Sequence, residues 1–162
     1  MRARAAVEYN APVRRIVGAW KERGLRRLAA WAAAVVADTL ERPDTSLTFV
    51  PPDPERRLKR GHHPAEALAR ELDRTWGIGV EPLLVRVRGS PRLRQRELNR
   101  AQRRGNVAAA FAARGRAVPD RVVLVDDVYT TGSTANAAAA ALRNAGCREV
   151  EIVTFARTIR MR

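Results

Sequence analysis

Residues 122–134 constrain the fold more than any other part of this 162-residue chain. Four apolar residues, Val122–Val125, form the kind of run expected of a strand buried on both faces of a parallel sheet. The acids Asp126 and Asp127 follow directly, and a turn of hydroxyl residues with Gly132 then leads into an alanine-rich helix. Ligands of open α/β sheets bind at the carboxyl ends of the strands. This stretch therefore predicts both an α/β fold and the place of its site.

The rest of the chain alternates between helical and β-type patterns. Apolar spacing and Pro/Gly boundaries predict helices over residues 12–41, 64–76 and 133–145, and strands over residues 46–50, 80–87, 107–111, 122–125 and 150–155. Alternating strands and helices imply βαβ crossovers and a parallel sheet flanked by helices. With no repeat or linker, residues 1–162 are expected to form one domain.

Composition excludes several classes of protein. No stretch of about 18 residues lacks charge, so no transmembrane span is expected. Residues 1–10 lack the apolar core of a secretory signal. The lone Cys147 excludes a disulfide framework and a zinc site built on several cysteines. These features predict a cytoplasmic protein with no membrane partner, in which the apolar stripe of residues 12–41 packs on a core rather than lying on a membrane.

The charge is strongly basic: 31 Lys and Arg stand against 17 Asp and Glu, a net charge of +14. Lys21 and Lys59 are the only lysines. Arginine favours bidentate contacts with phosphate, which suggests a polyphosphate or nucleic acid partner, although composition bias with solvated arginines explains the same count. Residues 86–104 hold eight arginines and one acid, Glu97, and are expected to form a mobile loop or arm.

The polar residues after the strand suit a sugar phosphate. The hydroxyls of the turn, the small Gly132 and the free N–H groups of the helix that follows can hold a phosphate. Asp126 and Asp127 would repel that phosphate, so they are expected to bind sugar hydroxyls or to lie near Mg²⁺. Together these parts describe a site for a ribose 5-phosphate.

The run also resembles the phosphoribosyl pyrophosphate (PRPP) signature of type I phosphoribosyltransferases. Residues 9–24, 50–61 and 98–107 resemble the ComF family, competence-associated homologues of these enzymes. The resemblance extends from about Tyr9 to Arg157 and implies a parallel sheet flanked by helices with a small hood. The N-terminal cysteine zinc module of the best-known members has no counterpart in this sequence.

The resemblance implies roles for particular residues. Asp126 and Asp127 would contact the ribose hydroxyls, directly or through Mg²⁺ and its waters. The 5-phosphate would lie in a loop made of Tyr129, Thr130, Thr131, Gly132, Ser133 and Thr134. The pyrophosphate loop and the flexible loop that closes over PRPP would contribute Arg57, Lys59, Arg60, Arg92 and Arg94.

The sequence departs from the family pattern at three places, one of which is the flexible-loop pattern Gln-x-Gly-Leu-Ser, present here as Gln95-Arg-Glu-Leu-Asn99. Relatives have Gly-Phe/Tyr-Asn-Gln where this chain has Gly61-His-His-Pro64, so His62 and His63 contact a ligand or are solvated loop residues. Some purine-salvage relatives place a carboxylate at the position of Thr130, and without it no general base is identified. Tyr129 either stacks on an acceptor or packs the loop.

These features predict a PRPP-binding protein that transfers phosphoribosyl to a nitrogen nucleophile with Mg²⁺ as cofactor and release of pyrophosphate. The acceptor is open, and a homodimer is one expectation for the assembly. The alternative is a non-catalytic PRPP sensor, or a DNA-uptake accessory that binds nucleic acid through residues 86–104. No aromatic residue lies in that arm, which disfavours a base-stacking platform.

Overall fold

A four-stranded parallel sheet organises the fold, in the order β1 (Ala3–Glu8), β6 (Glu149–Arg157), β5 (Arg121–Tyr129), β2 (Leu47–Phe49). The structure is a computed structural model, and it describes residues 2–53, 61–87, 110–115 and 117–159. Because all four strands are parallel, their carboxyl ends meet at one edge of the sheet. The predicted α/β class is confirmed.

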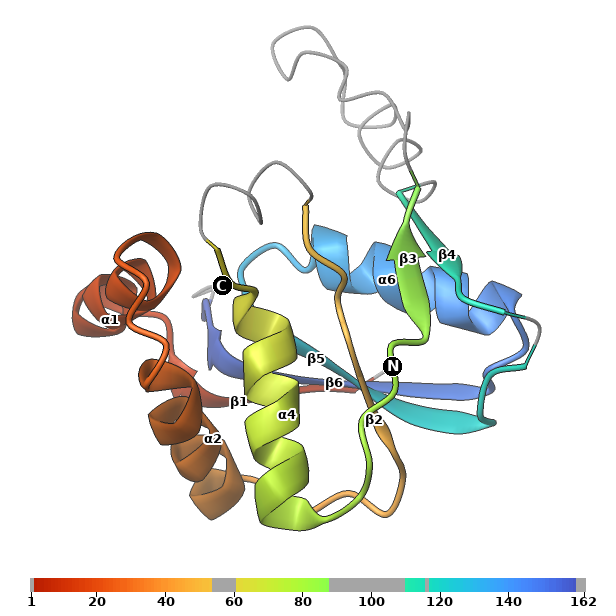
Figure 1. Cartoon of the computed structure of the whole chain (residues 1–162), viewed down its shortest axis with the longest axis horizontal. Coiled ribbons are helices and arrows are strands. Elements are labelled where there is room, and N and C mark those ends of the chain that lie inside the picture. The colour runs from red at the N-terminus through yellow and green to blue at the C-terminus, as the bar shows by residue number, and fades with distance from the viewer. Residues whose placement is uncertain (1, 54–60, 88–109, 116, 160–162) are drawn as a thin grey trace, which may run out of the picture.

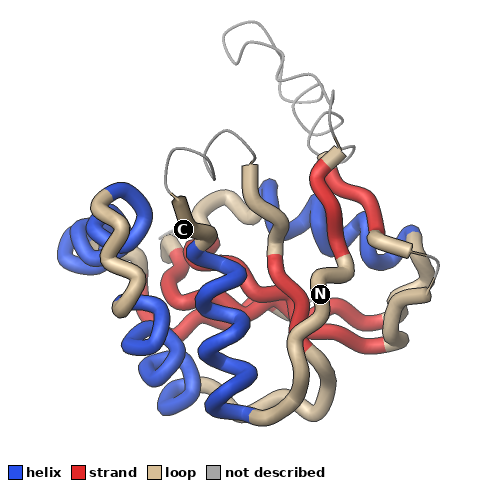
Figure 2. The backbone as a smooth tube through the Cα atoms, viewed as in Figure 1, coloured by secondary structure: helices blue, strands red, loops and turns tan. Residues whose placement is uncertain are grey.

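Helices cover both faces of this sheet (Figures 1 and 2). The helices α2 (Leu28–Thr39) and α4 (Pro64–Trp76) pack on one face, and α6 (Ser133–Asn144) packs on the other. The antiparallel hairpin of β3 (Leu84–Arg86) and β4 (Phe111–Ala113) lies beside α6. In the part of the chain that the structure describes, no helix has both the length and the apolar character to cross a membrane.

Local signals explain the bounds of α4, which agree with the sequence prediction. Pro64 occupies the first turn, where its missing N–H costs nothing. The His63 side chain accepts a hydrogen bond from the backbone N–H of Glu66 and so caps the helix. Gly77, with φ of 64°, ends it in the left-handed conformation.

The N-terminal region differs from the prediction. Residues 12–41 form two helices, α1 (Ala11–Glu22) and α2, because the backbone turns at Gly24, where φ is 67°. The strand β1 before them was not predicted, since its alanine-rich sequence carries no clear β alternation. It is a strand because β6 offers it a parallel partner from residue 152 to residue 157.

Further strands differ in their bounds, and the one expected over residues 80–87 is found only as the short β3, Leu84–Arg86. The strand expected over residues 107–111 is found as β4, which begins at Phe111 and ends two residues after the expected range. Residues 107–109 lie outside the described part. The strand expected to end at Val125 continues as β5 through both acids to Tyr129. This extension follows from pairing with β6, whose register reaches Arg157.

Candidate functional site

The two signature acids lie on opposite faces of the sheet. Asp126 follows Val125 in β5 and lines a small cavity of about 40 Å³ together with residues 128–135, the loop that leads into α6. Asp127 lies on the other face, where it meets α1. Consecutive residues of a strand alternate between faces, so adjacency in sequence separates these two side chains.

A salt bridge holds Asp127. Its Oδ2 atom lies 2.8 Å from Nζ of Lys21, near the end of α1, and Asp127 is only 8% exposed. No sequence pattern assigns a role to Lys21. Its rarity in an arginine-rich chain was the one available signal, because no spacing rule connects it with a residue more than a hundred positions away.

The carboxyl group of Asp126 has a raised pKa. Burial, and then the neighbouring charge of Asp127, raise its pKa to about 7. The backbone N–H of Asp127, which donates to Asp126 Oδ1 at 2.9 Å, and the charges of Lys21 and Arg86 act in the opposite direction. A cation or a set of hydroxyl donors at this carboxylate would favour its ionised form.

The loop between β5 and α6 is shaped by a close contact. Gly132 has φ of 75°, and a Cβ atom at this position would overlap the hydroxyl and ring of Tyr129. Tyr129 therefore packs against the loop, and Arg157 lies over its ring with Cζ 6.0 Å from the centroid. Of the two roles considered for Tyr129, these contacts favour packing.

The amino end of α6 is open to an anion. Gly132 precedes it and offers no capping side chain, and the first turn holds no acid. The hydroxyl of Thr131 lies 2.9 Å from that of Ser133 and accepts a hydrogen bond from the Ser133 N–H at 3.3 Å. Helix N–H groups and hydroxyls at such an end are suited to a phosphate.

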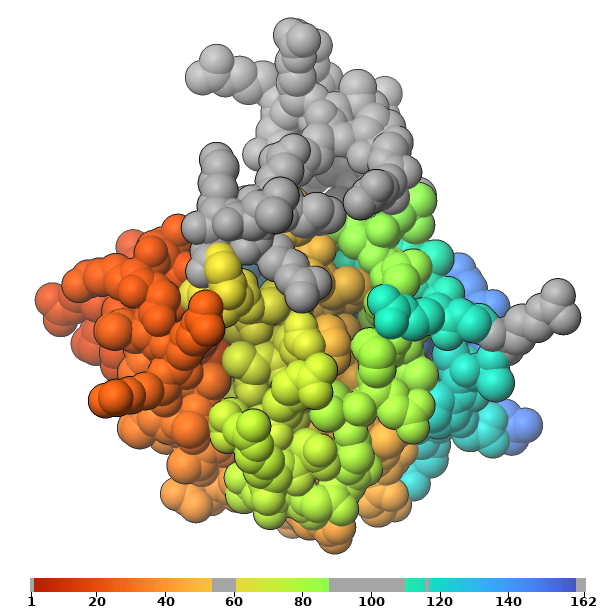
Figure 3. Space-filling view, viewed as in Figure 1, coloured from red at the N-terminus to blue at the C-terminus, as the bar shows by residue number. Residues whose placement is uncertain are grey.

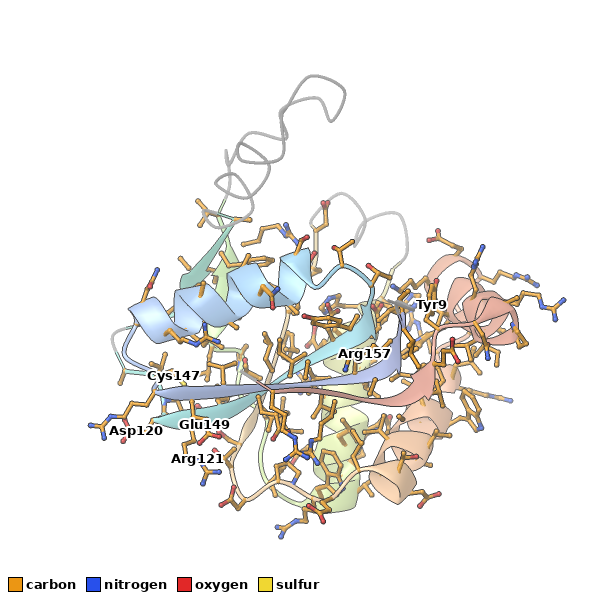
Figure 4. All side chains as sticks on the ribbon, turned by 180° about the vertical axis from the view of Figure 1, so that it is seen from behind. Tyr9, Asp120, Arg121, Cys147, Glu149 and Arg157 are labelled. Atoms are coloured by element: carbon orange, nitrogen blue, oxygen red, sulfur yellow. The ribbon has the colours of Figure 1, made fainter. Side chains whose placement is uncertain are left out.

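A larger cavity of about 840 Å³ adjoins the loop. It shares Tyr129, Thr130 and Thr131 with the smaller one, and its other walls come from β1, Leu40 and residues 157–159. Figure 4 shows Arg157 and Tyr9 at the carboxyl end of the sheet, far from Asp120 and Glu149 at its amino end. The two cavities thus meet at the edge where ligands bind in parallel sheets.

Both histidines that precede α4 make contacts within the protein. The His62 Nε2 atom lies 2.8 Å from the carbonyl oxygen of Trp20 in α1. His63 caps α4, and its ring lies edge-on to Phe49 at 5.9 Å between centroids. Neither is an ordinary solvated loop residue.

The remaining candidates cannot be placed. Arg57, Lys59, Arg60, Arg92 and Arg94 lie outside the described residues. Among the described residues, the structure brings Lys21 and Arg86 of β3 toward Asp126. The Arg86 guanidinium lies over the ring of Phe111, 4.6 Å from its centroid. In the sequence, Arg86 is only the first residue of the basic segment 86–104.

The acids fit Mg²⁺ only as part of a larger donor set. Carboxylate oxygens are suitable ligands, and Mg²⁺ commonly takes one or two of them with waters and substrate phosphates. One oxygen of Asp127 is engaged by Lys21, and one oxygen of Asp126 accepts a backbone N–H. Among the described residues no group of three or more His, Cys, Asp or Glu could hold a metal. Substrate oxygens would have to complete such a site.

Comparison with known proteins agrees with this arrangement. Residues 23–160 match the phosphoribosyl transferase domain family, and the chain belongs to that family. Within it the chain is ComF-like. It is 26% identical over 155 residues to "Competence protein ComFC" of Streptococcus pneumoniae, covering 95% of this chain and 67% of that protein. It is 33% identical over 144 residues to "Competence protein F" of Haemophilus influenzae, covering 85% and 62%.

Two solved structures share the fold. The allosteric regulatory enzyme of purine biosynthesis superimposes with a TM-score of 0.54 at 23% identity. The glutamine PRPP amidotransferase of B. subtilis, complexed with ADP and GMP, does so with 0.50 at 25%. Each match covers 80% of this chain and 25% of the other. The chain thus spans about two thirds of its curated relatives and a quarter of these enzymes.

Proposed function

We propose that the protein binds PRPP at the carboxyl end of β5 and transfers its phosphoribosyl group to a nitrogen nucleophile. One observation carries this proposal: Asp126 and the start of α6, where Gly132 provides no capping side chain, face the same small cavity. An anion-binding helix end and a hydroxyl-binding carboxylate therefore lie next to each other, as a ribose 5-phosphate requires.

The residues of the chain have distinct tasks in this reaction. The N–H groups of α6 and the hydroxyls of Thr131 and Ser133 bind the 5-phosphate, and Asp126 accepts hydrogen bonds from the ribose. Lys21 holds the Asp127 carboxylate in place. When bound, Mg²⁺ held by Asp126 and substrate oxygens would counter the charge of the leaving pyrophosphate. The cavity of about 840 Å³ beside the loop gives an acceptor room to approach.

The stability of the protein with PRPP tests the binding step. PRPP with Mg²⁺, at about a hundred times its dissociation constant, should stabilise the wild-type chain by roughly 2.7 kcal/mol. Asp126→Asn should lose most of this gain, while Asp120→Asn, which removes a carboxylate at the far end of β5, should keep it. If PRPP gives no gain in the wild type at any accessible concentration, the binding proposal fails. Pyrophosphate release with candidate acceptors then separates an enzyme from a sensor.

Nucleic acid is a second candidate partner, favoured by a basic surface. Five exposed arginines lie on α1 and the turn that follows it: Arg14, Arg15, Arg23, Arg26 and Arg27. Contacts between such residues and phosphates release counterions, so the affinity for an oligonucleotide should fall steeply with salt. Fluorescence anisotropy with a labelled single strand measures this dependence. Binding that is independent of salt would contradict a backbone contact through this surface.

A further inference from the structure

Between residues 28 and 37 the helix α2 is apolar on every side, although one side faces outward. Its sequence from residue 28 to residue 37 holds no charged residue. Ala29, Ala32, Ala33 and Val36 are buried against the core. Helices that are apolar all round are normally buried all round, so the outward side of α2 lacks the covering that its composition requires.

The exposed side of α2 forms one continuous patch. Six positions between residues 27 and 39 are exposed, and at 100° per residue five of them fall within one third of the helix circumference, while Thr39 lies outside it. We define the α2 face by these five residues: Arg27, Ala30, Trp31, Ala34 and Asp38. Trp31 is 45% exposed. The centre of the α2 face is apolar, and its two ends carry opposite charges. Figures 1 and 3 show α2 at the outer margin of the molecule, with α4 on its inner side.

We propose that this face binds a second copy of the same chain, with the two α2 helices antiparallel about a twofold axis. Arg27 and Asp38 are equally distant along the helix from the midpoint between Ala32 and Ala33, and so are Trp31 and Ala34. An axis through that midpoint places each Arg27 opposite Asp38 of the second copy. It also places each Trp31 ring opposite the small Ala34 of the second copy, so that a large side chain meets a shallow one.

Charge favours a second copy of the chain over a nucleic acid or a membrane as the partner of the α2 face. A phosphate backbone or an acidic lipid surface would attract Arg27 but repel Asp38 and the exposed Glu41 just beyond it. A second copy turned end to end carries the complementary charge at both ends of the α2 face. The helix dipoles are then antiparallel as well, which adds a small favourable contribution.

The association is expected to be weak. One helix pair buries less area than the roughly 800 Å² per partner of a standard interface, and two chains of net charge +14 repel each other. Sedimentation velocity of the full chain should therefore be followed from about 1 to about 300 μM, the range of weak associations. The wild type should pass from monomer to dimer within this range, and a monomer throughout would overturn the proposal.

Two sets of variants locate the interface. Ala34→Arg should weaken dimerisation at least about tenfold, whereas Asn144→Arg, which adds the same charge at an exposed position of α6, should leave it unchanged. Arg27→Asp and Asp38→Arg should each weaken the dimer about three- to tenfold, and the double charge swap should restore it. A dimer insensitive to Ala34→Arg, or a swap that fails to restore it, would place the interface elsewhere.

A further variant, Ala34→Glu, tests other occupants. Acidic phospholipid vesicles and a single-stranded oligonucleotide are added separately to the wild type and to Ala34→Glu. Loss of either interaction in Ala34→Glu, with no dimer in the wild type, would assign the α2 face to that ligand and overturn the proposal.

Discussion

The Nζ atom of Lys21 lies 2.8 Å from Oδ2 of Asp127, which ties the N-terminal helix α1 to the second acid of the signature strand. The two side chains are 24% and 12% exposed, so water screens the pair only in part. The contact links α1 to β5. It also occupies one carboxylate oxygen of Asp127, which without Lys21 could bind a ligand.

Removing the ammonium should therefore destabilise the fold. Lys21→Met leaves the Asp127 carboxylate without its partner at an almost buried position, at an expected cost of about 1–3 kcal/mol. Urea unfolding of the wild type, Lys21→Met, Asp127→Asn and the double variant gives the coupling between the two side chains. If the two single effects simply add in the double variant, the salt bridge contributes nothing to stability.

Stability should depend on pH through Asp126. Its pKa rises from 3.8 in an ordinary aspartate to about 7, so the folded chain binds this proton more tightly than the unfolded chain does. The free energy of unfolding should then fall as the pH rises from about 4 to about 7. Asp126→Asn removes this loss and should be the more stable protein at pH 8, by an amount on the order of 4 kcal/mol, and about equal at pH 4. A difference that does not change with pH would contradict the raised pKa.

The contact between Gly132 and Tyr129 should make Gly132→Ala costly. The new methyl group would meet the tyrosine ring, and φ of 75° adds backbone strain, which together should destabilise the fold by about 2–4 kcal/mol. Gly77→Ala is the matched control, because Gly77 has φ of 64° with open space around it and reports the strain alone. Thermal unfolding should show a larger loss of stability for Gly132→Ala than for Gly77→Ala. In a chain that also carries Tyr129→Ala, Gly132→Ala should cost no more than Gly77→Ala does.

His63 should contribute to stability as a helix cap. His63→Ala removes the acceptor for the Glu66 N–H and should cost about 0.5–2 kcal/mol, whereas His63→Asn, a favourable capping residue, should keep most of the stability. Chemical unfolding of the three proteins measures both effects. Equal losses in the two variants would show that the ring contact with Phe49, rather than the cap, holds this residue.

Much of the fold follows from local sequence patterns. The apolar run Val122–Val125 predicts a buried parallel strand, and Pro64 with Gly77 predicts the bounds of α4, because both signals act within a few residues. The loop before α6 also follows from its hydroxyl residues and Gly132. The sequence alone therefore determined the α/β class, the family and the position of the candidate site along the chain.

Only the tertiary structure decided what surrounds that site. Strand β1 exists because β6 pairs with it, and the strand β5 continues through Asp126 and Asp127 for the same reason. The sheet then sends one acid toward the loop of α6 and the other toward Lys21. No pattern of neighbouring residues encodes these relationships, because they depend on which distant segments pack together and thereby on burial and charge that exist only in the folded chain.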